Sequence, residues 1–114
     1  IVAVRRNMIL VGEARVRSRQ LFHSKTHGLS DYQSLQFLLD IPSAYQQLSS
    51  MVSASMKYLG KPFSSKPQIQ AIVVGGDSFL PFHNNLTDMR IWHIAIGREG
   101  ENIWYNGFFD GRDI

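Results

Sequence analysis

Three arginines at alternate positions are the first residues whose type and spacing could do chemistry. If residues 15–19 form a β-strand, the side chains of Arg15, Arg17 and Arg19 lie on one face of it. Guanidinium groups bind phosphate and carboxylate groups through paired hydrogen bonds. We therefore expect a basic strand face, joined by Arg5 and Arg6, that binds an anionic partner: a phospholipid headgroup, nucleic acid or an acidic protein.

The distribution of charge supports such a face. The chain has 114 residues and a net charge of +3, and its first 25 residues hold six of the twelve Lys and Arg but one of the nine Asp and Glu. The alternative is that these arginines only keep a solvent-facing edge strand from aggregating. The chain has no cysteine, which excludes disulfides and thiolate chemistry. We expect no cofactor and no metal site.

The second candidate surface is an aromatic hairpin over residues 90–110. Two β-rich runs there are joined by a polar loop that contains glycine, and both tryptophans of the chain fall in them. A hairpin this aromatic needs a partner surface to bury it. In a further hypothesis the chain is a structural interaction domain, and another protein subunit covers this hairpin. The candidate contact residues are Trp92, Trp104, Tyr105 and Phe108.

A serine in a Gly-Asp-Ser-x-Leu sequence suggests a third, enzymatic hypothesis. Residues 71–80 read as an apolar strand that opens into this sequence, with Ser78 as the serine. The segment resembles the first block of the GDSL hydrolases, in which the serine is the acyl nucleophile. A small hydrolase would use Ser78 with His83 or His93 as the base. The alternative is a turn that ends the strand, and we favour a non-enzymatic domain whose catalytic residues, if any, are unknown.

The elements that position the arginines are two N-terminal strands. Residues 1–4 form a short apolar run, a turn is expected at Arg6 and Asn7, and a second strand runs from Met8 to about Arg19. Gly12, inside that strand, indicates a bulge or a close approach of another backbone.

Two helices follow these strands. Ser30 or Asp31 is a good N-cap for a helix over residues 32–39, which Pro42 ends or kinks. A second helix over residues 44–59 has its apolar residues at helical spacing. These apolar positions include Leu48, Met51, Val52 and Leu59.

The remaining segments complete an α+β pattern. Gly60 is a natural end for the second helix, residues 68–74 are expected to form a strand, and the aromatic hairpin follows. The order ββααβββ predicts an antiparallel sheet of about five strands with two helices packed on one face. We expect residues 1–114 to be a single domain, excised from a larger protein because the chain begins with Ile1.

The aromatic hairpin also resembles the C-terminal domain of LssY-type membrane-associated proteins. The shared pattern is an Arg-x-Trp strand, a loop with glycine, and a second Trp strand that reaches an aspartate. It is carried by Arg90, Trp92, Gly100, Trp104 and Asp110, and residues 7–12 match the opening strand of that domain. The resemblance implies a soluble domain of a membrane-associated or envelope protein, and it supplies no catalytic residue.

Overall fold

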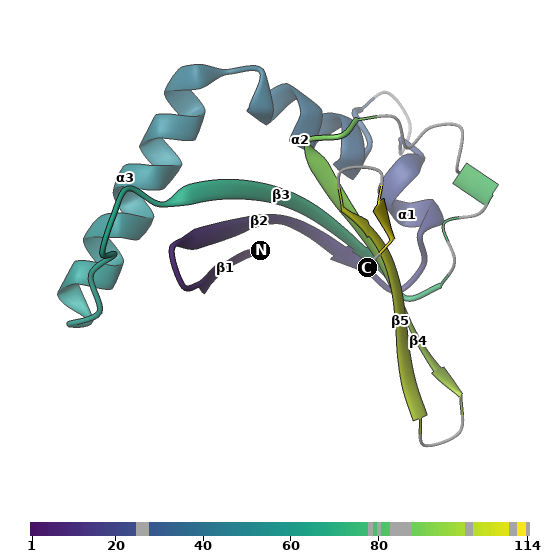
Figure 1. The fold of residues 1–114 in the computed structure, drawn as a ribbon. Helices are drawn as coiled ribbons and strands as arrows, with labels where there is room; N and C mark the ends of the chain where they lie inside the picture. The colour runs from purple at the N-terminus through teal and green to yellow at the C-terminus, as the bar shows by residue number, and fades with distance from the viewer. Residues whose placement is uncertain are drawn as a thin grey trace.

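In the residues that it describes, a computed structural model of the chain contains one six-stranded sheet and three helices (Figure 1). It describes residues 1–24, 28–77, 79, 81–82, 88–99, 102–109 and 112–113, those from 98 onward by their backbone alone. The elements are β1 (Val2–Arg5), β2 (Met8–Arg15), α1 (Arg19–Phe22), α2 (Asp31–Leu39), α3 (Pro42–Tyr58), β3 (Gln68–Gly75), β4 (Ile91–Glu99), β5 (Asn102–Phe109) and β6 (Arg112–Asp113). The mixture of helices and strands agrees with the α+β expectation.

The sheet is mixed, which corrects the expectation of a fully antiparallel sheet. The strands lie side by side in sequence order, but β2 pairs with β3, and β3 with β4, in parallel. All three helices lie between β2 and β3 in the chain, so the connection crosses over and brings β3 back in the direction of β2. The two hairpins, β1–β2 and β4–β5, are antiparallel as expected.

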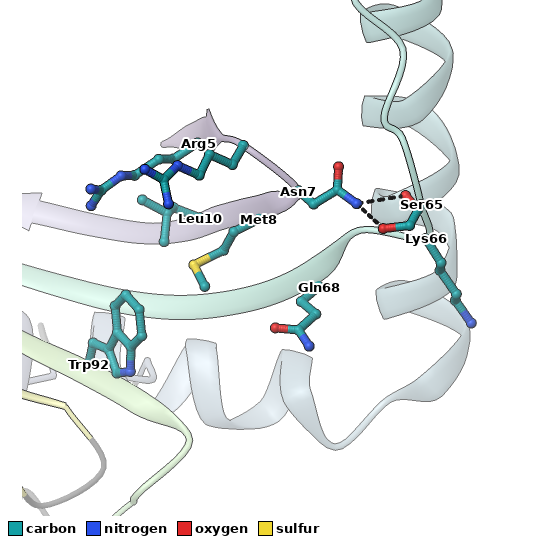
Figure 2. Close-up of a pocket in the computed structure, with 9 residues that line it drawn as sticks. Arg5, Asn7, Met8, Leu10, Ser65, Lys66, Gln68 and Trp92 are labelled. Carbon is teal, nitrogen blue, oxygen red and sulfur yellow. Dashed lines mark hydrogen bonds between the residues drawn. The ribbon is translucent and has the colours of Figure 1, made fainter.

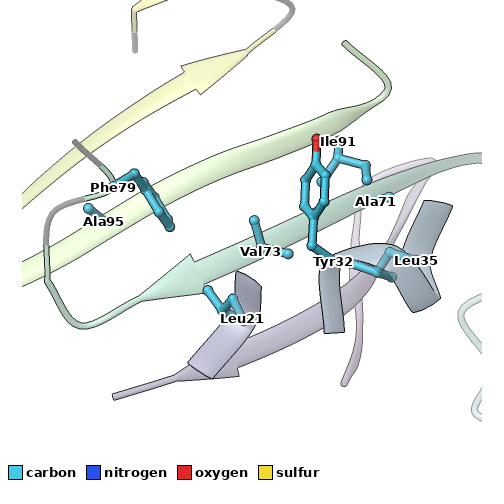
Figure 3. Close-up of a cluster of buried hydrophobic side chains, with 8 residues drawn as sticks. All are labelled: Leu21, Tyr32, Leu35, Ala71, Val73, Phe79, Ile91 and Ala95. Carbon is cyan, nitrogen blue, oxygen red and sulfur yellow. The ribbon is translucent and has the colours of Figure 1, made fainter. Parts of the chain in front are cut away.

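One face of the sheet carries the core, because side chains alternate between the two faces of a strand. Ala71 and Val73 of β3 are fully buried, and their register partners Ile91 and His93 of β4 are 1% and 5% exposed. Helices α1 and α2 cover this face (Figure 3). The buried apolar cluster consists of Leu21, Tyr32, Leu35, Ala71, Val73, Phe79, Ile91 and Ala95.

The second strand ends earlier than the alternating arginines suggested. It stops at Arg15, and α1 begins at Arg19, where a continuing strand was expected. The cause is a contact with a distant turn. The backbone N–H of Ser18 donates to the Asp77 carboxylate at 2.6 Å, and the Ser18 hydroxyl donates to the Asp77 carbonyl at 3.0 Å. These bonds bend the chain away from the sheet before Arg17.

The start of α2 follows its sequence signal, and the start of α3 differs by a few residues. Ser30 caps α2 in a reciprocal capping box with Gln33, as its position predicted. Pro42 follows α2 and is also the first residue of α3. Its missing N–H costs no hydrogen bond there, because the first N–H groups of a helix have no partner within the helix. Gly60 has φ +74° just after α3, which fits its expected role as a helix stop.

Helix α3 lies on the same side of the sheet as α2 but packs loosely. The Tyr45 hydroxyl donates to the Ile69 carbonyl of β3 at 2.9 Å, yet none of the α3 residues is buried. Its expected apolar stripe is only partly covered, since Met51 is 61% exposed and the following Leu59 66% exposed. Figure 1 shows α3 projecting beyond the sheet, consistent with a radius of gyration of 15.2 Å, above the roughly 13 Å typical of this length.

Candidate anion-binding site

The face of the sheet opposite the helices is apolar and carries no described helix. Strand alternation places Leu10, Ile72 and Trp92 on this face, along with Val74 and Ile94, and all five are half-buried. Sheets with parallel strands normally have both faces covered. We call this surface the open face.

A cavity of about 390 Å³ lies at one end of the open face (Figure 2). Its residues come from the β1–β2 hairpin, the segment before β3, the first residue of β3, and β4. They are Arg5, Arg6, Asn7, Met8, Leu10, Ser65, Lys66, Gln68 and Trp92. The cavity therefore combines an apolar floor with a cationic rim, and we call it the rim pocket.

The hairpin turn that carries the cationic rim is held by its neighbours. Arg5 pairs with Met8 in the register, so Arg6 and Asn7 form the turn expected from the sequence. Arg6 has φ +53°, a left-handed conformation that costs a non-glycine residue about 1–2 kcal/mol. The Asn7 side-chain amide donates to the Ser65 carbonyl at 3.1 Å and to the Ser65 hydroxyl. These bonds fix the turn over the segment before β3.

The two arginines of the rim pocket have no counter-charge in the described part of the chain. Arg5 and Arg6 are exposed, and no described carboxylate lies within 4.0 Å of either guanidinium group. Figure 2 shows the Lys66 side chain pointing away from the Trp92 ring, so the guanidinium groups dominate the rim. Such groups are free to form paired hydrogen bonds with an incoming phosphate or carboxylate.

The three alternating arginines do not form the basic strand face that the sequence suggested. Arg15 is the last residue of β2, Arg17 lies beyond the strand, and Arg19 opens α1. Arg15 is also paired, since its Nε donates to the Asp31 carboxylate at 2.8 Å. Of the five candidate arginines, Arg5 is therefore the one whose strand position puts it on the open face.

The aromatic candidates divide between described and undescribed side chains. Trp92 lines the rim pocket together with Arg5 and Arg6, a neighbourhood that the sequence left open. Trp104, Tyr105 and Phe108 belong to β5, opposite Gly97, Ile96 and His93 in the hairpin register. The side chains of these three residues lie outside the described part of the structure, so the interaction surface expected there stays a prediction.

The hydrolase hypothesis gains no support from the described residues. Ser78 and His83 lie outside them. His93 is 5% exposed and packs against the rings of Tyr32 and Phe79, with ring centroids 5.7 and 6.2 Å away. Burial lowers the pKa of His93 to about 4, against the smaller opposing effect of Asp88. His93 is therefore a neutral core residue at physiological pH.

Sequence reasoning missed a second charged cluster, at the start of β4. The carboxylate of Asp88 accepts from Arg90 Nε at 3.0 Å, from Arg90 Nη2 at 2.8 Å and from the Gln36 amide at 3.2 Å. Arg90 also donates to Asp40 at 2.7 Å. Bonds from Arg90, more than any other cause, hold the pKa of Asp88 at about 2, although burial opposes them. In the sequence, the close spacing of Asp88 and Arg90 is the only signal that predicts their ion pair.

We expect Asp88→Asn to lower the free energy of unfolding by about 2 kcal/mol, because it breaks charge-assisted bonds at a side chain that is 9% exposed. Asp40→Asn is the matched control, since its side chain is 66% exposed and contacts the same arginine. The control variant should lose less than about 1 kcal/mol of the free energy of unfolding. Urea denaturation measures both, and equal losses would contradict a structural role for Asp88.

A larger groove of about 830 Å³ separates α3 from β3 but is a weaker candidate for anions. Its cations are Lys66 and Arg90. Arg90 is already neutralised by Asp40 and Asp88. The groove therefore offers an anion less positive charge than the rim pocket does.

Comparison with protein-family models, curated proteins and solved structures finds no match to this chain. The resemblance to LssY-type domains accordingly stays a prediction. Within the described residues, no helix has the length and apolar character of a membrane span. The same residues hold no cluster of three or more His, Asp or Glu that could bind a metal.

Proposed function

We propose that this chain is a non-enzymatic binding domain and that its rim pocket binds an anionic group of its partner. The observation that carries the proposal is the pair of exposed guanidinium groups, on Arg5 and Arg6, without a described counter-charge. They stand beside the apolar Met8, Leu10 and Trp92 in one cavity. An anion bound there would meet hydrogen-bond donors on one side and a low-polarity wall on the other.

The physical reason is that charge-assisted bonds strengthen where water is partly excluded. A phosphate or carboxylate can accept two parallel N–H bonds from each guanidinium group. The wall formed by Trp92 and Met8 lowers the local dielectric constant and strengthens the attraction. Because the rim remains open to solvent, binding should weaken as salt is added.

The test is calorimetric titration with inorganic pyrophosphate at two salt concentrations. Arg5→Gln combined with Arg6→Gln should weaken binding about tenfold or more, because it removes two positive charges and the paired guanidinium donors at the rim. The matched control is Arg17→Gln combined with Arg19→Gln, which removes the same charge from exposed positions away from the pocket. The control should change affinity by less than about twofold, since only screened long-range attraction is lost.

Either of two results would contradict the proposal. One is that pyrophosphate does not bind the unmodified protein at low salt. The other is that the two double variants lose affinity equally, which would mean that net charge alone attracts the anion. Circular dichroism of both variants checks that the sheet and helices are intact.

A further inference from the structure

The open face continues from the rim pocket as a strip of aliphatic side chains. Leu10 lines the pocket, and Ile72, Val74 and Ile94 follow along β3 and β4. Ile72 pairs with Trp92, and Val74 with Ile94, so these side chains lie in adjacent rows across the sheet. From Trp92 to Ile96 of β4 the strip runs roughly 13 Å at the usual rise of a strand.

Charge on the open face is confined to one end. Arg5 pairs with Met8 at the hairpin end, and the positions that follow on β2, β3 and β4 of this face carry no charged side chain as far as Ile96. Two polar residues, Gln68 and Gln70, precede Ile72 on this face of β3. Gln68 lines the rim pocket, and the Gln70 amide donates to the Ala71 and Arg90 carbonyls at 3.0 and 2.9 Å. The open face is therefore cationic at the hairpin end and aliphatic along the rest of its described length.

We propose that the ligand of this face is a single-chain anionic amphiphile, a long-chain alkyl phosphate or carboxylate. This inference rests on the proposed function, because the head group would occupy the rim pocket at Arg5 and Arg6. The alkyl chain would lie along Leu10, Ile72 and Ile94. Burying methylene groups there would also cover a sheet face that parallel strands rarely leave open.

Two other occupants fit these observations less well. Single-stranded nucleic acid needs aromatic platforms for its bases, and Trp92 is the one aromatic side chain described on this face. A membrane surface attracts cations placed around an apolar patch. Here Arg5 and Arg6 lie at one end of the strip, along the direction of the strands. This arrangement matches a molecule with one charged head group and one alkyl chain.

The experiment measures affinity for butyl, octyl and decyl phosphate below their aggregation thresholds. Affinity should rise about two- to fourfold for each added methylene that is buried. Ile72→Thr combined with Ile94→Thr should weaken decyl phosphate binding about tenfold and leave pyrophosphate binding unchanged. Val2→Thr is the matched control, an exposed branched residue at a β1 position whose register partner is Val11, and it should change neither affinity.

The outcomes separate this inference from the proposed function. If pyrophosphate binds but the affinity does not rise from butyl to decyl phosphate, the proposed amphiphile ligand is refuted and the proposed anion site is not. If no anion binds, both fail. Binding to anionic phospholipid vesicles without binding to monomeric decyl phosphate would overturn the single-molecule ligand in favour of a membrane surface. Tighter binding of a single-stranded oligonucleotide than of decyl phosphate would overturn it in favour of nucleic acid.

Discussion

Gly12→Ala should lower the free energy of unfolding by about 4 kcal/mol. A Cβ at position 12 would lie 1.6 Å from the Ile72 carbonyl oxygen and 2.7 Å from its carbon. Both atoms are backbone of the neighbouring strand β3, so no side chain can rotate out of the way. Relief requires β2 and β3 to separate, and that would break the parallel pairing at the centre of the sheet.

Gly60→Ala is the matched control for this prediction. A Cβ at position 60 would meet nothing within 4 Å, and only the φ of +74° makes alanine unfavourable there. That strain should cost about 1 kcal/mol. Urea denaturation followed by circular dichroism compares the two variants. A loss in Gly12→Ala as small as that in Gly60→Ala would mean that β2 and β3 do not pack as described.

The second large effect is a loss of stability in acid, caused by His93. The pKa of His93 is lowered from 6.5 to about 4, mainly because the imidazole is buried. Between these values the unfolded chain binds a proton at His93 and the folded chain does not, so the free energy of unfolding falls as the pH falls. The loss attributable to His93 should reach about 3 kcal/mol near pH 4.

His93→Phe should abolish this acid sensitivity, because phenylalanine fills a similar volume between Tyr32 and Phe79 and does not titrate. At pH 7 we expect its stability to stay within about 1 kcal/mol of the original. His23→Gln, at an exposed position, is the matched histidine control and should keep the acid sensitivity that His93 causes. Asp88 acts at lower pH, since its pKa is about 2 in the folded protein. An unchanged slope between pH 6.5 and 4 in His93→Phe would contradict a buried neutral imidazole.

The elements that the sequence predicted correctly are those with local signals. The turn at Arg6 and Asn7, the capping box at Ser30 and the stop at Gly60 each depend on residues within a few positions of one another. The expected close approach at Gly12 also holds. Its register with β3 is continuous, so the alternative of a bulge is wrong.

The errors of the sequence reading come from contacts between distant residues. The alternation of Arg15, Arg17 and Arg19 is a genuine strand pattern, but the bonds between Ser18 and Asp77 end the strand. The residues around Ser18 carry no sequence signal that predicts a hydrogen bond to Asp77, which lies 59 positions away. The parallel pairing of β2 with β3 depends in the same way on how the three helices return the chain to the sheet.

The candidate site was predictable in its parts but not in its assembly. Arg5, Arg6 and Trp92 were all singled out from residue type and position. Their meeting in one cavity follows from the order β1-β2-β3-β4, which places the hairpin turn and β4 on opposite sides of β3. The half-buried aliphatic side chains of Ile72 and Ile94 on the open face were not predictable either, because the sequence of an apolar strand is similar whether one face or both are covered.

The most direct test of the anion site is to locate the bound anion by NMR. Amide and indole proton shifts of the uniformly labelled protein would be followed during titration with inorganic pyrophosphate. We expect the largest changes at the amides of residues 5–8, Ser65, Lys66 and Gln68 and at the Trp92 indole, because these residues line the rim pocket. Changes centred on residues 15–19, or no saturable change anywhere, would contradict the proposed site.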